Sequence, residues 1–427
     1  MNIVKCDLKK FYEEKDNKNI IVFGASIEAK DFFRITFTEN RILFFIDNNE
    51  EKQQGKVYIN NSCFDVYPVE RIKNSEYNNS IILIGSSMYD TEMLEQLSKM
   101  NAENICYLIS DIAKTEYNTL KAMFIKKPLS AQEVDDTVGY LVGKNNPKPF
   151  CIPRLKLTVT TKCDLNCKHC RALIPYLDEH KNRSLEEICN DIDLIANNVD
   201  FIGVCELIGG EPLIYPHLAE VIDYAVAFDN IKYVYVTTNC TIIPDEKLLK
   251  SLQNPKVILM LSDYGLLDKM AKLVSVLEKN NIYFSIEKYE QWEDCGHGEF
   301  NGKSVDELKD KYKVCVSKHC GVKIATQIDN GKLYGCFFSE RLEKKGLTLQ
   351  NDYTEIFKDD TREEVQEKIR YYYEDVEYLE ACNYCGQGER VSKKVKPAIQ
   401  LVGKIEPSAY TIVNREEYNK LLRERKN

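Results

Sequence analysis

A β-branched run followed by three closely spaced cysteines decides the fold of this chain: Leu157-Thr158-Val159-Thr160-Thr161-Lys162-Cys163-Asp164-Leu165-Asn166-Cys167-Lys168-His169-Cys170. The run predicts a buried strand, and the cysteines fall in the loop after it. Three thiolates from one loop can hold a [4Fe–4S] cluster whose fourth iron has no protein ligand. The alternative is zinc, with His169 or a distant residue as fourth ligand, because short cysteine clusters are often structural metal sites.

Later apolar runs also end in small or polar residues. Gly209-Gly210-Glu211-Pro212 ends one run, and two further runs end in Thr237-Thr238-Asn239 and Ser262-Asp263. Glycines without side chains let a ligand backbone approach closely, and Glu211 offers a carboxylate for an ammonium group. A zinc knuckle has no use for such residues. Together they favour an iron–sulfur cluster with a small chelating cosubstrate.

The ordered pair of motifs resembles the signature of the radical S-adenosylmethionine (SAM) superfamily, with Gly-Gly-Glu-Pro in the place of its methionine-binding motif. The resemblance implies a cluster held by Cys163, Cys167 and Cys170. It also implies that SAM binds the open iron and yields a 5′-deoxyadenosyl radical, which takes a hydrogen atom from the substrate. By position it assigns the cosubstrate contacts to His169, Gly209, Gly210, Glu211, Thr238, Asn239, Ser262 and Asp263.

Strands and helices alternate between residues 155 and 289. Strands are expected to begin near Leu155, Phe201, Tyr233, Val257 and Tyr283. Amphipathic stretches such as Leu185–Ala196, Leu218–Phe228 and Leu266–Leu277 lie between them. Successive βα units form a curved parallel sheet whose site lies at the carboxyl ends of the strands. The fold class expected is α/β, with a partial (β/α)6 barrel of the kind that the family resemblance implies.

The first 110 residues predict a separate Rossmann-like parallel sheet, with strands at Ile20–Gly24, Ile42–Asp47, Ser80–Gly85 and Ile105–Ile109. Gly24 and Asp47 match part of a dinucleotide-binding layout, but Ser26 stands where a second glycine should be. Nicotinamide binding is therefore weakly indicated. A sugar nucleotide, or a docking role, is the alternative.

The last third predicts a small auxiliary metal domain. Asp329-Asn330-Gly331 between alternating runs predicts a hairpin. Cysteines flank it, and a C-x-x-C pair follows. The spacing of Cys320, Gly331, Cys336, Cys382 and Cys385 resembles the SPASM extension, in its shortened "twitch" form. The resemblance implies a second [4Fe–4S] cluster held by these four cysteines, with a zinc ribbon as the alternative.

Residues between the two metal regions are candidates for the chemistry on the substrate. Cys295 and Cys315 could return a hydrogen atom, replace one of the four auxiliary ligands, or be idle. Asp294 or His297 could take a proton, and Trp292 could stack on a sugar ring, unless this loop is only packed structure.

Composition limits the function classes. A net charge of −9 over 427 residues argues against a nucleic-acid partner. The polar start predicts no signal peptide, and no run approaches a membrane span, so we expect a cytoplasmic protein with reduced thiols. We expect five segments: 1–110 Rossmann-like, 111–150 connector, 151–300 radical SAM barrel, 301–390 auxiliary domain and 391–427 tail.

Function follows from the auxiliary cysteines. Four protein ligands saturate a cluster, which can then accept an electron from a substrate radical. This arrangement resembles that of twitch-bearing radical SAM dehydrogenases. The resemblance implies a radical SAM oxidoreductase acting on a small polyhydroxylated molecule: a carbohydrate, aminocyclitol or sugar nucleotide. Flavodoxin or ferredoxin would supply reducing electrons. The alternatives are an epimerase, a maturase of ribosomally synthesised peptides and, in another class, a non-catalytic electron carrier.

Overall fold

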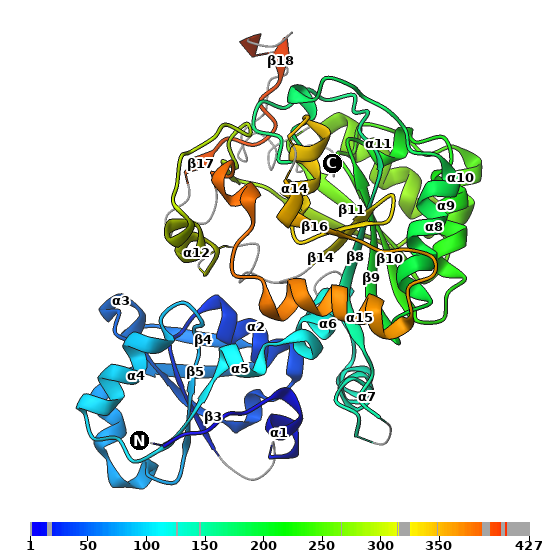
Figure 1. The fold of residues 1–427 in the computed structure, drawn as a ribbon. Helices are drawn as coiled ribbons and strands as arrows, with labels where there is room; N and C mark the ends of the chain where they lie inside the picture. Colours follow the sequence, from blue (N-terminus) through cyan, green and yellow to red (C-terminus); the bar gives the residue numbers. More distant parts are fainter. Residues whose placement is uncertain are drawn as a thin grey trace. The chain divides into compact units, whose positions relative to one another are not determined.

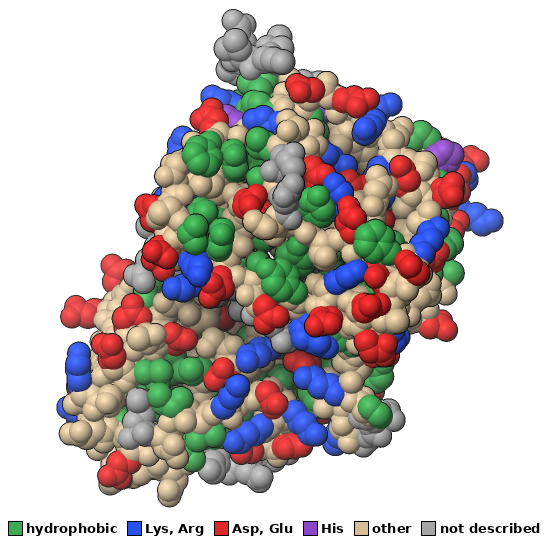
Figure 2. All heavy atoms as spheres, viewed as in Figure 1, with side chains coloured by type: hydrophobic (Ala, Val, Ile, Leu, Met, Phe, Trp, Pro, Cys, Tyr) green, Lys and Arg blue, Asp and Glu red, His purple; other side chains and the backbone are tan. Residues whose placement is uncertain are grey.

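The computed structural model describes residues 2–14, 19–124, 127–144, 147–265, 267–313, 315, 325–347, 349–386, 393–402 and 406–407. Two compact units meet in the sequence at Cys151 and Ile152 (Figure 1). Acidic and basic side chains are interspersed over the face in Figure 2. Within the described residues, no helix combines the length and apolar character needed to cross a bilayer.

The first unit is built on a sheet with the strand order β1-β7-β6-β2-β3-β5-β4. Its pairs are parallel, except for the antiparallel hairpin of β4 and β5. The strands are β1 Asn2–Ile3, β2 Ile20–Phe23, β3 Ile42–Ile46, β4 Lys56–Ile59, β5 Ser62–Tyr67, β6 Ile81–Ile84 and β7 Ile105–Leu108. The helices are α1 Leu8–Glu13, α2 Ile27–Thr36, α3 Glu50–Gln53, α4 Asp90–Lys99, α5 Ile109–Ile112, α6 Thr115–Phe124 and α7 Ala131–Leu141.

This parallel sheet confirms the predicted α/β class. The segment expected to be a connector forms α6 and α7, which pack on the same unit. Tyr117 of α6 contacts the ring of Phe32, with centroids 5.2 Å apart, and Lys121 pairs with Asp31 at 3.7 Å.

In the loop that resembles a dinucleotide-binding site, the polar groups of this unit bond to one another. The Ala25 amide donates to Asp47 Oδ2 at 2.8 Å, and Lys52 pairs with the same carboxylate at 3.2 Å. The Ser26 hydroxyl donates to the Gly85 carbonyl and caps α2. Since Asp47 is bound by its own chain, it is poorly placed to accept a ribose hydroxyl, which argues against nicotinamide binding.

The second unit carries a sheet of order β12-β11-β10-β9-β8-β14-β15-β16. Its strands are β8 Cys151–Thr160, β9 Phe201–Gly209, β10 Ile231–Thr238, β11 Val257–Asp263, β12 Phe284–Lys288, β14 Ala325–Asp329, β15 Lys332–Tyr334 and β16 Tyr353–Glu355. A two-residue pair joins β13 Trp292–Glu293 and β17 Lys394–Val395, and another joins β18 Leu401–Val402 and β19 Glu406–Pro407. The helices are α8 Leu185–Ala196, α9 Leu218–Val226, α10 Glu246–Leu252, α11 Leu267–Lys279, α12 Val305–Lys313, α14 Phe337–Lys344 and α15 Arg362–Arg370.

The strands from β9 to β12 pair in parallel, as the alternating pattern predicted, and β8 is the neighbour of β9 in the sheet. The predicted hairpin of β14 and β15 also forms, with register Asp329↔Lys332. Its first strand has a second role that the sequence did not reveal. β14 pairs in parallel with β8, so the hairpin extends the barrel sheet instead of standing apart from it.

A buried ion pair fixes the hairpin turn to α8. Asp191 is 1% exposed, and its carboxylate accepts from the backbone amides of Asn330 (2.9 Å) and Gly331 (2.8 Å). Arg183 Nη2 donates to the same carboxylate at 2.6 Å. Both turn residues have positive φ, which asparagine and glycine tolerate best. The turn is therefore held by charge as well as by its own sequence.

Candidate functional site

The carboxyl ends of β8, β9, β10 and β11 lie at one edge of the barrel sheet (Figure 1). The cysteine loop leaves β8 at this edge and is tied to the end of β9. The Gly210 amide donates to the Thr160 carbonyl at 2.8 Å, and the Glu211 amide to the Lys162 carbonyl at 2.9 Å. The two motifs that define the sequence are thus joined by backbone hydrogen bonds.

The two glycines are required by this crossing. A Cβ at Gly209 would lie 2.2 Å from the Thr160 carbonyl oxygen, and one at Gly210 would lie 2.1 Å from that of Lys162. Real Cβ atoms do not approach oxygen so closely. The sequence predicted that the missing side chains admit a ligand. The structure gives them a different neighbour, the backbone of the cysteine loop.

Glu211 is fully buried and bonded to the chain. Its carboxylate accepts from the Leu213 amide (3.0 Å), the Thr238 hydroxyl (2.8 Å) and the Asn239 amide (2.7 Å). Burial raises the pKa of this carboxyl to about 7. Three donors of the chain thus contact this carboxylate, and the contact with an ammonium group stays a prediction. Its role is to join the ends of β9 and β10.

Asn239 connects the end of β10 with the cysteine loop. Its Nδ2 donates to Asp164 Oδ1 at 3.0 Å and lies 3.7 Å from Cys163 Sγ. At the next strand end, Ser262 and Asp263 are buried, and Asp263 Oδ1 accepts from the Gly265 amide. The predicted cosubstrate residues at the ends of β9, β10 and β11 therefore lie along one edge of the sheet, next to the cysteine loop that carries His169.

The three cysteines of the loop belong to one packed group with Leu165 and Ala398. Cys170 lies within electrostatic range of both Cys163 and Cys167. Burial raises the pKa of all three thiols, that of Cys167 to about 12. The Leu165 amide donates to Cys163 Sγ at 3.4 Å. Buried neighbouring sulfurs with N–H donors suit an iron–sulfur cluster, whose thiolates accept such bonds.

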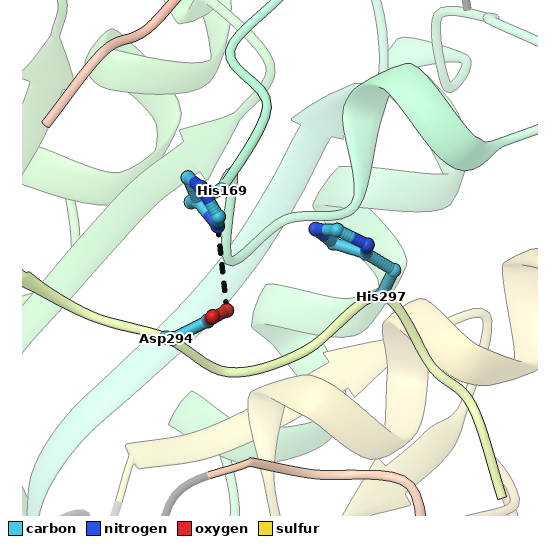
Figure 3. Close-up of side chains that lie close together, drawn as sticks. All are labelled: His169, Asp294 and His297. Carbon is cyan, nitrogen blue, oxygen red and sulfur yellow. Dashed lines mark hydrogen bonds and ion pairs between the residues drawn. The ribbon is translucent and has the colours of Figure 1, made fainter. Parts of the chain in front are cut away.

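His169 lies beside a carboxylate and a second imidazole (Figure 3). Its Nδ1 is 3.4 Å from Asp294 Oδ1, and the His169 and His297 ring centroids are 5.7 Å apart. The donor atoms of the three residues lie within 4.8 Å of one another. Asp294 also accepts from the Gly296 amide and pairs with Lys393 at 3.3 Å. His169 is thus turned toward Asp294, which weakens the zinc alternative that needed it as fourth ligand.

Two aromatic contacts shape this region. The Tyr176 ring stacks on His297 at a centroid distance of 4.5 Å. Trp292 meets Tyr264 edge to face at 5.1 Å and packs against the cluster of Leu165, Cys167 and Ala398. Trp292 is therefore largely committed to packing beside the cysteine loop, which leaves the sugar-stacking hypothesis without support.

A second group of cysteines gathers near the first. Cys336 lies within electrostatic range of Cys315, and Cys382 within range of Cys336, Cys315 and Cys385. Burial raises the pKa of Cys336 and of Cys382. Cys320, the remaining predicted ligand, lies outside the described residues. Among the described residues, Cys315 thus lies near two of the predicted auxiliary ligands, Cys336 and Cys382.

Two cationic side chains, those of Lys311 and Arg171, lie beside this second group of cysteines. Buried Lys311 donates from Nζ to the carbonyls of Cys382 and Cys385, which fixes the C-x-x-C turn. Arg171 directly follows Cys170 and lies within electrostatic range of Cys295, Cys315, Cys336 and Cys385. Cys295 is 3% exposed, and burial raises its pKa to about 12. Its carbonyl accepts from the Gly386 amide at 2.7 Å.

Residues 157–273 match the Radical SAM superfamily, and they span the cysteine loop, the Gly-Gly-Glu-Pro turn and the strand ends just described. These residues form a radical SAM domain. The family implies a [4Fe–4S] cluster and SAM, and the three-thiol loop with its buried N–H···S contacts fits that group.

One curated relative is the antilisterial bacteriocin subtilosin biosynthesis protein AlbA of Bacillus subtilis (strain 168). It is 28% identical over 157 residues, or 29% of this chain and 33% of that protein. The match therefore spans about a third of the relative's length.

Solved structures show weaker likenesses. anSMEcpe with bound AdoMet and the Kp18Cys peptide has 15% identity and a TM-score of 0.36, covering 55% of this chain and 88% of that one. BtrN with AdoMet and 2-DOIA has 12% identity and a TM-score of 0.31, covering 52% and 82%. Streptococcus suis SuiB with its precursor peptide SuiA has 14% identity and a TM-score of 0.30, covering 71% and 82%. These scores are too low to support a functional inference.

Some residues around the radical SAM site carry no sequence signal. Lys311 reaches the C-x-x-C carbonyls from α12, which lies far away in sequence. Residues 398–401 lie on the cysteine loop, although the sequence placed them in a tail. Neither belongs to a spacing motif, so only the folded structure reveals them.

Proposed function

We propose that this radical SAM enzyme is an oxidoreductase with a second, auxiliary [4Fe–4S] cluster, acting on a small polyhydroxylated substrate such as a carbohydrate, aminocyclitol or sugar nucleotide. One observation supports the proposal: Cys336 and Cys385 pack on the same apolar cluster as Cys163 and Cys170 of the radical SAM loop, and Cys315 and Cys382 lie within electrostatic range of Cys336. Four thiolates saturate a cluster, which leaves it free for electron transfer. We assign the ligands as Cys336, Cys382, Cys385 and either Cys315 or Cys320.

The SAM-bound cluster supplies a 5′-deoxyadenosyl radical when present. The chain's own part is to hold the cosubstrate along the strand-end edge, where Asn239 and Asp263 offer polar contacts beside the cysteine loop. His169 belongs to that loop and is oriented by Asp294. Burial and the ring contacts of Tyr176 and Trp292 limit water around the site.

The electron count requires both metal sites. With SAM and both clusters bound, the substrate carbon would give up one hydrogen atom, and loss of a hydroxyl proton and one electron would then leave a carbonyl. Asp294 or His297 would accept the proton, and Cys336, Cys382, Cys385 and a fourth cysteine would hold the group that takes the electron. The reductant, a flavodoxin or ferredoxin, supplies the electron that starts each cycle.

Reaction in deuterated water tests this oxidation. Candidate polyhydroxylated substrates would be incubated with the reconstituted enzyme, SAM and a reductant, and the products analysed by mass spectrometry. The proposal expects a mass lower by about two hydrogens and no new carbon-bound deuterium. A product of unchanged composition bearing one solvent deuteron would instead indicate an epimerase. Loss of that deuteron in C295A or C315A would identify the hydrogen donor.

A peptide substrate is the second candidate, and the match to the bacteriocin biosynthesis protein AlbA favours it. A peptide maturase could use the same two metal sites. The discriminating measurement is 5′-deoxyadenosine formation with polyhydroxylated compounds and with precursor peptides encoded beside the gene. Stimulation by a peptide alone would replace the first candidate with the second.

A further inference from the structure

Residues 398–401, which we name the strap, run antiparallel to the cysteine loop. Cys167 and Gln400 form an isolated antiparallel bridge. The Lys168 amide donates to the Ile399 carbonyl at 2.7 Å, and the Leu401 amide to the Asn166 carbonyl at 2.8 Å. The strap therefore binds the loop on both sides of Cys167.

Gln400 is the polar centre of the strap and is 4% exposed. Its Oε1 accepts from the Asn166 amide at 2.7 Å. Its Nε2 donates to Cys167 Sγ at 3.0 Å and to the Ala398 carbonyl at 2.8 Å. All three bonds are made inside the protein.

The orientation of this amide follows from its partners. The backbone N–H of Asn166 can only donate a hydrogen bond, so the side-chain oxygen of Gln400 must face it. Its nitrogen then faces the sulfur. A flipped amide would set N–H against N–H and would leave Cys167 without its donor. The N–H···S contact is thus imposed by the backbone of the loop.

Apolar side chains close the strap over this contact. Ala398 packs with Leu165 and Cys167, and Trp292 and Tyr264 pack against the same group. Ala398 is 2% and Leu401 6% exposed. Little water reaches the sulfur, so a hydrogen bond there has a strong electrostatic effect.

We propose that Gln400 is a positioning residue that fixes Cys167 and raises the reduction potential of the cluster bound by the radical SAM loop. The inference rests on the cluster assignment in the proposed function. A reduced cluster carries one more negative charge, and an N–H donor to a ligand sulfur stabilises that form more than the oxidised one. Gln400 would thus ease the reduction that begins each turnover.

The test is a redox titration of the full-length reconstituted enzyme, followed by electron paramagnetic resonance. The relevant signal is the one that changes on adding SAM. Gln400→Met keeps the length of the side chain but removes the donor. Gln400→Glu keeps an acceptor for the Asn166 amide and replaces the donor with an oxygen. Gln366→Met is the matched control, because Gln366 donates to the Asn198 carbonyl, a contact outside the metal sites.

We expect a lower midpoint potential in both Gln400 variants and the wild-type value in Gln366→Met. An unchanged potential in a Gln400 variant that retains its iron would overturn the inference. Loss of this cluster from both variants would also overturn it, because Gln400 would then be needed to retain the cluster and not to set its reduction potential. If the wild-type enzyme itself shows no SAM-sensitive signal, the proposed function fails instead.

Discussion

Gly210 stands where the end of β9 crosses the backbone of the cysteine loop, and the space beside its Cα holds only a hydrogen atom. The same crossing explains Gly209. Both glycines are therefore required for the packing of the cysteine loop, and they affect cosubstrate binding only through that loop.

Gly210→Ala tests whether the close backbone contact at this position, and not the general flexibility of glycine, is what the loop requires. A Cβ there meets the Lys162 carbonyl oxygen at 2.1 Å and Cys163 Cβ at 3.0 Å, so the loop must move. We expect loss of about half of the bound iron and of 5′-deoxyadenosine formation. Gly139→Ala is the control, since nothing lies within 4 Å of a Cβ there. It should retain both and gain up to about 1 kcal/mol of stability, because it lies inside α7. Equal iron in both variants would contradict this.

Asp352 predicts a pH dependence of stability. It is fully buried, and desolvation raises its pKa from 3.8 to about 6, although the Ser339 hydroxyl and two backbone amides donate to it. The folded state therefore keeps a proton that the unfolded chain has lost. This contribution is full below about pH 4 and disappears as pH rises through 6, with a slope of at most about 1.4 kcal/mol per pH unit.

Asp352→Asn should remove this slope. We expect the melting temperature of the wild type to fall relative to that of the variant between about pH 4 and 6, and the two to run parallel above about pH 7. Asp310→Asn, at a side chain that is 78% exposed, should follow the wild type throughout. Parallel curves for wild type and D352N would show that Asp352 ionises normally.

At the scale of elements, α8 and the β14–β15 turn depend on one buried carboxylate. Asp191→Ala removes the partner of Arg183 and the acceptor of two turn amides. Breaking a buried ion pair costs about 3–5 kcal/mol. We expect a loss of that size in the free energy of unfolding, measured by denaturant titration.

Glu220→Ala provides the comparison for Asp191→Ala. Glu220 pairs with Lys247 at 2.6 Å, but the two side chains are 33% and 63% exposed. Exposed pairs contribute about 0–1 kcal/mol. Similar losses in the two variants would show that the Asp191 network has no special role.

Periodicity explains which elements the sequence could predict. β9, β11 and α8 begin where their patterns began, since burial of one face dictates both spacing and sequence. The β4–β5 hairpin was missed, because its short strands lie at the sheet edge and turn at Asn60-Asn61 without glycine. The parallel pairing of β14 with β8 was also missed, since it joins segments that are remote in sequence.

For the whole molecule, local spacing located the radical SAM loop but not what surrounds it. Cys163, Cys167 and Cys170 share one loop, so their proximity is encoded locally. Lys311 and Gln400 reach the metal regions only through tertiary folding. The auxiliary ligands are an intermediate case. The C-x-x-C pair is evident from spacing, whereas the sequence left the role of Cys315 open between ligand, hydrogen donor and idle residue, and only the fold brings it near Cys336 and Cys382.

In the proposed two-cluster enzyme, one cysteine group serves radical generation and the other serves a later electron transfer. Iron content and 5′-deoxyadenosine formation, measured together after anaerobic reconstitution, test it most directly. The wild type should bind about eight irons, four per cluster. C163A/C167A/C170A should keep about half and form no 5′-deoxyadenosine, whereas C382A/C385A should keep about half and still form it. Formation of 5′-deoxyadenosine by the triple variant would contradict the account.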